Sequence, residues 1–302
     1  MSRRGWVLFS VMCVLWGIPY LLIKVAVGEV SVPMVVFART AIGTVLLLPV
    51  ALRAGGFRKV REHWRFVLLF AVLEILGPWA LLSDAERTLS SSLTGLLIAA
   101  TPIVGVLIGR ATGDAERLGP VRWGGLLLGL AGVALLAGPR LGGGDVRALG
   151  EVLLVVIGYS TAPIVMTRRL GDVPSLAMTT SCLGTAALVY AAPAALTLPD
   201  ALPDGHVLAA LGALGAVCTA VAFVVFFELI REVGPSRALV FTYVNPAVAV
   251  VAGTVFLSET LTVGMGVSFA LILCGSVFAT VRSAPRQAAA AAVGEAPIEA
   301  GG

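Results

Sequence analysis

Long apolar runs separated by short polar breaks occupy most of the chain. A helix of about 18–20 apolar residues spans the roughly 30 Å hydrocarbon layer of a bilayer. The runs are apolar on all sides, whereas the strands of a membrane barrel alternate polar and apolar residues. The pattern therefore predicts ten transmembrane helices, over residues 6–25, 31–52, 66–83, 90–109, 121–138, 150–167, 175–197, 206–230, 235–257 and 264–281.

The composition agrees with an all-α membrane protein. The 302 residues are 58% hydrophobic and 13% charged, with a mean hydropathy of +1.00. A soluble domain carries about 25% charged residues, so charge is too scarce here to cover a water-exposed surface. The start, MSRRGWVLFSVMCVLWG, has a basic end and an apolar run but is followed by no small-residue cleavage site, and we interpret it as an uncleaved first helix.

Basic residues indicate the orientation. With the N-terminus inside, the inner segments carry 16 of the 21 Lys and Arg residues, and the outer segments carry only Arg87, Arg140 and Arg147. Cytoplasmic loops retain Lys and Arg, so we expect a cell (inner/plasma) membrane protein with both termini in the cytoplasm. These cations face anionic lipid head groups and are spread over six segments, which argues against a nucleic-acid partner.

The sequence aligns with itself at a shift of 144 residues. The matched pairs are Pro19 and Pro163, Lys24 and Arg168, Asp84 and Glu228, Arg87 and Arg231, Pro102 and Pro246, and Gly109 and Gly253; Glu116 and Glu259 match at a shift of 143, as do Gly132 and Gly275. So many ordered matches predict two homologous halves, residues 1–140 and 148–282. The Ala/Gly-rich tail, 283–302, is expected to be disordered and cytoplasmic.

Five helices in each half give the halves opposite orientations in the membrane. Inverted repeats recur in secondary transporters, because two similar halves can exchange conformations and expose one central site to each side in turn. The repeat therefore predicts a central cavity between the halves and a transport function.

Three segments carry a family resemblance. They are WGIPYLLIKVA (16–26) with VPMVVFAR (32–39), the first-half ending SSLTGLLIAATPIVGVLIG…AERL…GGLLLGLAGVALL, and the second-half ending SRALVFTYVNPAVAVVAGTVFLSETLTVGMGVSFALILCG. Over about residues 6–281 the chain resembles the EamA family of the drug/metabolite transporter (DMT) superfamily, although GRATGDAERLG departs with an extra Asp114. The resemblance implies ten helices, an inverted repeat and efflux or exchange of small metabolites such as amino acids.

Two ionisable residues lie deep in the predicted helices. Arg39 and Glu74 each lie about eight residues into a helix, or about 12 Å from opposite surfaces, so their depths differ by only about 6 Å. Buried charges in membranes usually face a protein interior or a polar path. We expect the two to form a charge pair beside the cavity; the alternative is a pair that only locks two helices together.

Asp84 and Glu228 are repeat mates near helix ends. The simpler interpretation is solvation or pairing with Arg87 and Arg231. The alternative is a coupling or gating role in which one carboxylate takes up a proton, since a low-dielectric site favours the neutral carboxyl.

Trp16, Tyr20 and Lys24 recur every four residues and share one helix face. Tyr159 holds a comparable place in the sixth helix. The aromatic rings are candidate substrate contacts or ordinary packing residues. Lys24 is a candidate coupling residue, or a cation that extends to the outer interface.

Prolines within the spans are candidate helix breaks. Pro19, Pro163, Pro102 and Pro246 each remove a backbone hydrogen bond. Tyr243 and Asn245, beside the last of these, are candidate substrate ligands at such a break, or partners in hydrogen bonds between helices. The glycine stripes (residues 105, 109, 113 and 125, 129) suit close helix contact, which leaves a homodimer open.

No nucleotide-binding loop, nucleophile elbow or metal cluster is present, so neither a cofactor nor a metal is expected. The predicted function is a secondary transporter, an exporter of amino acids or related polar compounds, with a small-molecule substrate and the lipid bilayer as partners. A membrane-embedded enzyme or a receptor without transport activity are the alternatives. An enzyme would need clustered acids or histidines near the interface, where only DAER (84–87) and GDAER (113–117) come close.

Overall fold

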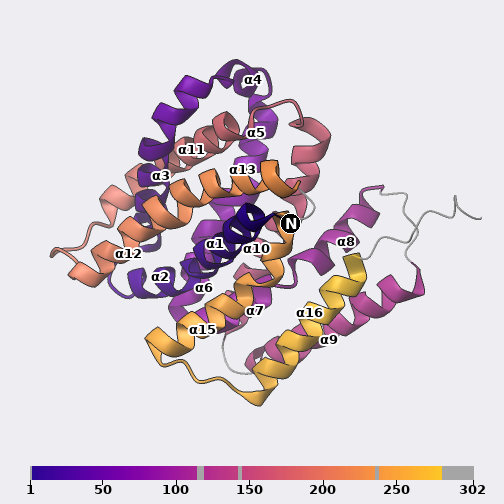
Figure 1. The fold of residues 1–302 in the computed structure, drawn as a ribbon. Coiled ribbons are helices and arrows are strands. Elements are labelled where there is room, and N and C mark those ends of the chain that lie inside the picture. The colour runs from indigo at the N-terminus through magenta and orange to yellow at the C-terminus, as the bar shows by residue number, and fades with distance from the viewer. Residues whose placement is uncertain (1, 114–118, 142–144, 235–237, 281–302) are drawn as a thin grey trace, which may run out of the picture.

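The computed structural model describes residues 2–113, 119–141, 145–234 and 238–280, and these residues form a bundle of helices without strands (Figure 1). The predicted tail, 283–302, and Arg140's side chain lie outside the described part. The helices up to residue 141 are α1 (Arg3–Gly17), α2 (Pro19–Ala26), α3 (Val32–Ala54), α4 (Phe57–Glu62), α5 (Trp64–Ala71), the π-helical η1 (Val72–Leu76), α6 (Gly77–Thr88), α7 (Ser91–Ile98), α8 (Thr101–Ala111) and α9 (Pro120–Leu141).

The remaining described helices begin after residue 145. They are α10 (Val146–Arg169), α11 (Ser175–Leu196), α12 (Gly205–Gly215), the π-helical η2 (Ala216–Val221), α13 (Ala222–Val233), the 3₁₀ segment η3 (Leu239–Tyr243), α15 (Asn245–Leu257) and α16 (Val263–Thr280).

The structure confirms an all-helical membrane protein of about ten spans. Nine helical stretches in the described residues are long and apolar enough to cross a membrane, and a shorter apolar helix, Asn245–Leu257, follows η3. Serines begin several of them: the side chains of Ser2, Ser31 and Ser90 accept hydrogen bonds from backbone N–H groups three residues on. Such caps satisfy donors that a helix start leaves unpaired.

Two helices contain a π-helical segment at corresponding places in the sequence. η1 begins at Val72 and η2 begins at Ala216, which is 144 residues later. The breaks in the fourth and ninth spans show the same offset, since α8 follows Ala100 and α15 follows Val244. The helix irregularities therefore recur at the shift found in the sequence.

Glycines allow the closest helix contacts. α9 packs against α16, and a Cβ atom added to Gly275 would clash with the backbone of Gly129. Gly125 is similarly close to the backbone of Ala279. The stripe at Gly125 and Gly129 thus packs inside the chain.

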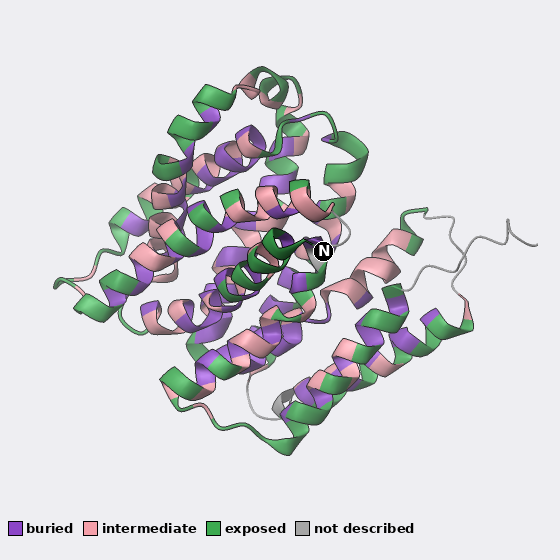
Figure 2. Ribbon diagram, viewed as in Figure 1, coloured by how far each residue is buried: buried purple, intermediate pink, exposed green. Residues whose placement is uncertain are grey.

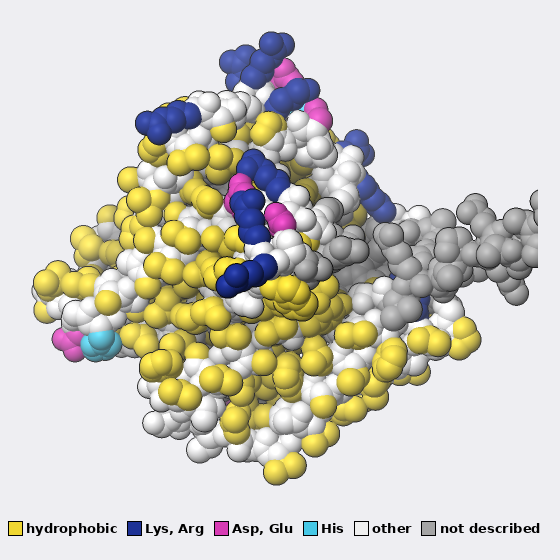
Figure 3. All heavy atoms as spheres, viewed as in Figure 1, with side chains coloured by type: hydrophobic (Ala, Val, Ile, Leu, Met, Phe, Trp, Pro, Cys, Tyr) yellow, Lys and Arg dark blue, Asp and Glu magenta, His cyan; other side chains and the backbone are white. Residues whose placement is uncertain are grey.

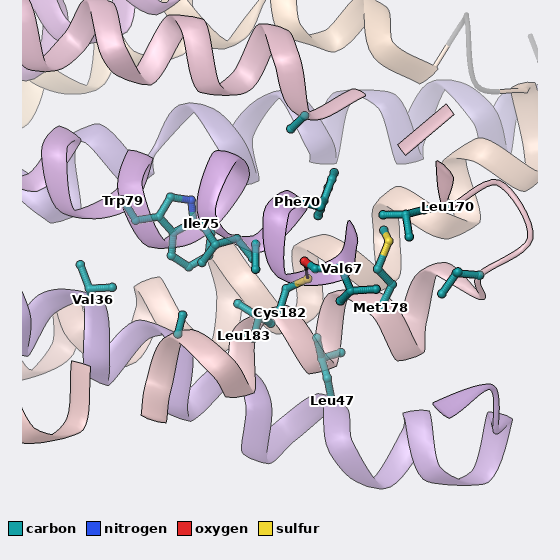
Figure 4. Packing of buried hydrophobic residues seen from close by; sticks show 14 of the residues in the cluster. Val36, Leu47, Val67, Phe70, Ile75, Trp79, Leu170, Met178, Cys182 and Leu183 are labelled. Atoms are coloured by element: carbon teal, nitrogen blue, oxygen red, sulfur yellow. Dashed lines mark hydrogen bonds between the residues drawn. The ribbon is translucent and has the colours of Figure 1, made fainter. Parts of the chain in front are cut away.

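Buried side chains lie between the helices, and exposed apolar ones cover the outside (Figures 2 and 3). One buried cluster joins α3, α5, η1, α6 and α11, with Leu47, Phe70, Trp79 and Cys182 among its members (Figure 4). An apolar exterior suits the hydrocarbon core of a bilayer, which contains no water to bind polar groups.

Two details differ from the expectation. α6 runs to Thr88 instead of ending near residue 83, because Ala85, Glu86 and Arg87 are compatible with a helix and extend it. The predicted break at Pro163 is wrong: α10 is continuous from Val146 to Arg169. Proline fixes a φ angle that a helix tolerates, so it costs one hydrogen bond without ending a helix that is packed on both sides.

Candidate functional site

A buried arginine lies where helices from both parts of the chain meet. Arg39 of α3 is 6% exposed, and its Nε donates to Oγ1 of Thr219 in η2 at 3.0 Å. Its guanidinium carbon lies 3.6 Å from the centroid of the Trp79 ring of α6. A cation over an aromatic face is stabilised by the ring quadrupole, and more strongly when both are desolvated.

The two π-helical segments supply polar groups at this level of the bundle. Thr219 donates in turn to the carbonyl oxygen of Leu214 at 2.8 Å, five residues earlier. The hydroxyl of Tyr190 in α11 donates to the carbonyl oxygen of Leu76, the last residue of η1, at 2.9 Å. π-helical turns often occur at functional sites because they present backbone and side-chain groups that a regular helix conceals.

The expected charge pair between Arg39 and Glu74 is absent from the described residues. Glu74 lies in η1 and is half-buried, and no hydrogen bond or ion pair joins it to Arg39, which contacts Thr219 and Trp79. Equal depth places two residues at one height but does not turn their side chains toward each other. Glu74 interacts electrostatically with Tyr159 and Cys182 instead.

The two candidate tyrosines lie near Arg39. Tyr20 of α2 is 8% exposed and packs in one cluster with the partly buried Tyr159 of α10. Both phenols interact electrostatically with Arg39. The centre therefore combines Arg39, Trp79, Thr219, Tyr20 and Tyr159, and we call these five residues the central cluster.

Trp16 belongs elsewhere. Its ring lies among Phe226, Phe241 and Phe223, at centroid distances of 5.0, 5.2 and 5.5 Å. Offset and edge-to-face rings at these distances stabilise packing between α1, α13 and η3. The packing interpretation therefore fits Trp16 better than a substrate contact.

The residues beside Pro246 also hold helices together. With the amide oriented to satisfy its hydrogen bonds, Asn245 donates to the carbonyl oxygens of Phe241 at 3.1 Å and Cys13 at 3.3 Å. The hydroxyl of Tyr243 lies 3.0 Å from that of Thr280 in α16. Both side chains thus have partners within the fold.

Pro19, Pro102 and Pro246 each stand in the first turn of a helix, after a break in the span. That position suits proline, because its missing N–H has no helical acceptor there.

The predicted coupling acids form ion pairs at the two ends of the bundle. Asp84 lies 3.4 Å from Arg87 and also contacts Arg147. Glu228 lies 2.6 Å from Arg231 and 2.9 Å from Arg4. These half-buried, paired carboxylates fit the interfacial interpretation.

Lys24 does not extend to the surface. Its ammonium donates to the backbone carbonyl oxygens of Glu86 at 2.6 Å and Leu89 at 2.8 Å, at the end of α6. A cation at a helix C-terminus complements the partial negative charge of the unpaired carbonyls. These two hydrogen bonds of Lys24 thus connect α2 to the end of α6.

Sequence reasoning missed Glu259, which lies between α15 and α16 and binds the start of α7. Its carboxylate accepts hydrogen bonds from the backbone N–H groups of Ser91 at 2.7 Å and Ser92 at 2.9 Å, and from both hydroxyls. Partial burial raises the pKa of Glu259, but the hydrogen bonds from Ser92 and Ser91 outweigh it and hold that pKa below its usual value. The repeat match with Glu116 was the only signal.

It also missed Glu86. The segment DAER suggested a loop, whereas the structure puts Glu86 in α6 with an exposed fraction of 0%. Neither carboxyl oxygen has a hydrogen-bond partner among the described residues.

One exposed group has metal-ligand types. Glu29, Asp204 and His206 bring their ligand atoms within 4.8 Å of one another. His206 lies 3.6 Å from Glu29 and 3.8 Å from Asp204, so contacts among these side chains account for the group. Exposed side chains of these kinds commonly gather without an ion.

About ten apolar helices that enclose a buried cation define a polytopic membrane protein with a polar centre as the class of protein. A charge in the interior of a membrane bundle is expensive and marks a polar path or a ligand site. The chain belongs to the EamA-like transporter family, whose model matches residues 3–138 and 148–281.

Its relatives carry similar descriptions. The chain is 25% identical to the uncharacterized transporter YvbV of Bacillus subtilis, over 97% of both chains. It is 27% identical to the uncharacterized inner membrane transporter YedA of Escherichia coli K12, over 82% of this chain and 81% of the relative. It is 30% identical to the aromatic amino acid exporter YddG of Ancylobacter novellus, over 76% of this chain and 80% of that protein. These relatives are described as transporters or exporters, which argues against the enzyme alternative.

The fold has a counterpart among solved structures. A crystal structure aligns with a TM-score of 0.65 and 22% sequence identity, covering 93% of this chain and 97% of the other. At this identity the likeness concerns the fold alone.

Proposed function

We propose that the protein is a secondary transporter that exports amino acids or related small polar compounds. It works by alternating access between two inverted five-helix halves in the cell membrane, with both termini in the cytoplasm. The observation that carries the proposal is Arg39, a buried cation that contacts Trp79 of the first half and Thr219 of the second.

Helix pairing supports the two inverted halves. Under a twofold relation, each span in the first half matches the span five places later. The strongest contacts follow that pattern: α3 packs on α11, α7 on α15 and α9 on α16, while α6 on α10 corresponds to α13 on α1. The matching offsets of η1 and η2 and the two ranges of the family model agree with it.

Arg39 has the chemistry of a carboxylate anchor. Its Nε is occupied by Thr219, whereas its two terminal amino groups donate to no residue in the described part of the chain. Two parallel N–H groups of a guanidinium bind a carboxylate in a bidentate manner. The α-carboxylate of an amino acid is therefore the group that we assign to this position.

The aromatic members of the central cluster suit an apolar or aromatic side chain on the substrate. Tyr20, Tyr159 and Trp79 border Arg39, and rings offer both stacking faces and apolar surface. The relative YddG is described as an aromatic amino acid exporter, which supports phenylalanine as the first compound to test.

Exchange in proteoliposomes tests the proposal. The full-length chain is reconstituted with internal phenylalanine, leucine or glutamate, and entry of the radiolabelled amino acid is followed. Arg39→Ala removes the anchor and should abolish exchange. The control is Arg53→Ala, which removes an exposed arginine from the end of the same helix and should leave exchange intact.

Exchange by Arg39→Ala at the wild-type rate would contradict the anchoring role. Failure of the wild-type chain to exchange any compound of an amino-acid and nucleoside panel would contradict the transport proposal.

A further inference from the structure

Glu86 is a charged type of side chain in a place where a charge is poorly tolerated. It lies in α6, is completely buried, and neither of its carboxyl oxygens has a hydrogen-bond partner among the described residues. An ionised carboxylate loses strong hydration on burial, and the loss is repaid only by hydrogen bonds or an adjacent cation. A carboxyl group in this setting is stable with its proton bound.

The charged groups around Glu86 act on its carboxyl group through space and do not hydrogen-bond to it. From α2, the ammonium of Lys24 binds the backbone oxygen of Glu86 and not its carboxyl group. Lys24 and Arg39 of α3 attract the carboxylate, while Glu259, bound at the start of α7, repels it. Tyr20 of α2 also faces Glu86.

The remaining neighbours of α6 direct their charges elsewhere. On α10, Arg147 binds Asp84 and Glu151. In η1, Glu74 interacts with Tyr159. Lys24 is thus the cation that an opening of this end would free from its backbone partners.

We propose that Glu86 is the proton-binding residue that couples transport to the proton gradient. The proposal rests on the proposed transport function and replaces Asp84 and Glu228 in the coupling role, since both of those are held in surface ion pairs. Buried ionisable groups in transporters commonly serve as proton carriers.

The structure indicates how binding and movement are linked. The contacts of Lys24 with the carbonyl oxygens of Glu86 and Leu89 close this end of the bundle, which the charge pattern places outside. When these contacts break, water enters from outside, Lys24 is released, and the Glu86 carboxylate takes up a proton from that water. Reclosure leaves the neutral carboxyl group buried. When the bundle opens to the cytoplasm, the O–H bond breaks and the proton passes to water inside, so that one proton enters for each substrate molecule exported.

The site belongs to one half only. The residue 144 positions after Glu86 is Ile230, an apolar side chain. One proton per cycle is therefore the expected stoichiometry, and two equivalent proton sites are not.

An infrared measurement tests the proposal without any substrate. Difference spectra of the full-length protein in lipid, recorded between acid and alkaline pH, should show the C=O band of a protonated carboxyl group without hydrogen bonds. The band should be missing in Glu86→Gln and retained in Asp84→Asn and in Glu62→Gln, a surface control from α4. Absence of the band in the wild type, or its retention in Glu86→Gln, would overturn the proposal.

Chemical modification covers the case in which the variant fails to fold. A hydrophobic carbodiimide reacts with protonated carboxyl groups in apolar surroundings, so the wild-type protein should carry the adduct on Glu86 and lose reactivity at alkaline pH. An adduct confined to other carboxyl groups would contradict the proposal.

Transport then separates this inference from the proposed function. With radiolabelled phenylalanine, Glu86→Gln should retain exchange but lose accumulation driven by a pH gradient. Gradient-driven accumulation at the wild-type level in Glu86→Gln would overturn the coupling role. If the wild-type chain moves no compound of the amino-acid and nucleoside panel, the transport proposal fails, while the infrared band still decides the protonation of Glu86.

Discussion

At the residue scale, the centre of the molecule is asymmetric with respect to the proposed repeat. The residues 144 positions after Arg39 and Glu74 are Leu183 and Cys218, so the first half supplies the charged groups. The second half supplies Thr219, a hydrogen-bond acceptor for Arg39. A site at which one half provides the cation and the other positions it depends on both halves at once.

The cation–π contact makes a prediction about Trp79. Trp79→Leu removes the ring under Arg39 and leaves a buried cation less stabilised, by about 1–2 kcal/mol for a desolvated pair. The thermal midpoint in detergent should fall, and amino-acid exchange should weaken. Trp79→Phe keeps a ring and should lose less of both. Equal losses for the two variants would show that only volume matters at this position.

Glu259 makes a pH-dependent prediction. Glu259→Gln weakens the cap of α7, and loss of a cap costs about 1 kcal/mol. Because the pKa of Glu259 is held below its usual value, its contribution to stability is present above the carboxyl pKa of the unfolded chain. That contribution disappears as the pH falls through the lower, folded-state pKa. Unfolding midpoints of both proteins across this range should converge on acidification; a constant difference would contradict the account.

At the element scale, close helix contacts depend on individual glycines. A Cβ atom at Gly275 meets the backbone of Gly129, which cannot move aside as a flexible side chain would. Gly275→Ala should therefore separate α9 from α16 and destabilise the fold by about 1–3 kcal/mol. Gly266→Ala lies on the same helix with no atom within 4 Å and should be neutral. Thermal unfolding of both variants makes the comparison, and equal midpoints would exclude a backbone clash.

Continuity of α10 gives a second element-scale prediction. Since α10 passes Pro163 without a break, Pro163→Ala should restore a backbone hydrogen bond and leave exchange nearly unchanged. Loss of exchange in Pro163→Ala would show that the proline has a role in movement that the continuous helix does not reveal.

The sequence predicted the elements better than the site. Apolar length fixes a span, so nine predicted spans match membrane-length helices of the described residues to within a few residues, apart from the extension of α6 to Thr88. The predicted span 235–257 corresponds to η3 and the shorter helix α15. The π-helical segments were missed, because an inserted residue leaves the pattern of a helix that is apolar on all sides unchanged. Arg39 was identified from its burial cost, whereas its partners Thr219 and Trp79 depend on helix rotation, which depth along the membrane does not specify.

At the scale of the whole molecule, the proposed function requires two halves that alternate around the central cluster. The paired helices and the two π-helical segments have the arrangement expected for inverted halves. Such halves can exchange conformations because each contains the same breaks, and the central site then faces opposite sides in turn. The two chain ends should react only with impermeant reagents that are applied from the cytoplasmic side.

Accessibility of Thr219 tests alternating access most directly. A single cysteine is placed by Thr219→Cys in a chain whose native cysteines, Cys13, Cys182, Cys218 and Cys274, are replaced by alanine. Impermeant maleimide is then applied from either side of oriented vesicles. Labelling from both sides, each suppressed by a transported amino acid, is the predicted result. Labelling from one side only, or labelling that the amino acid leaves unchanged, would contradict the account.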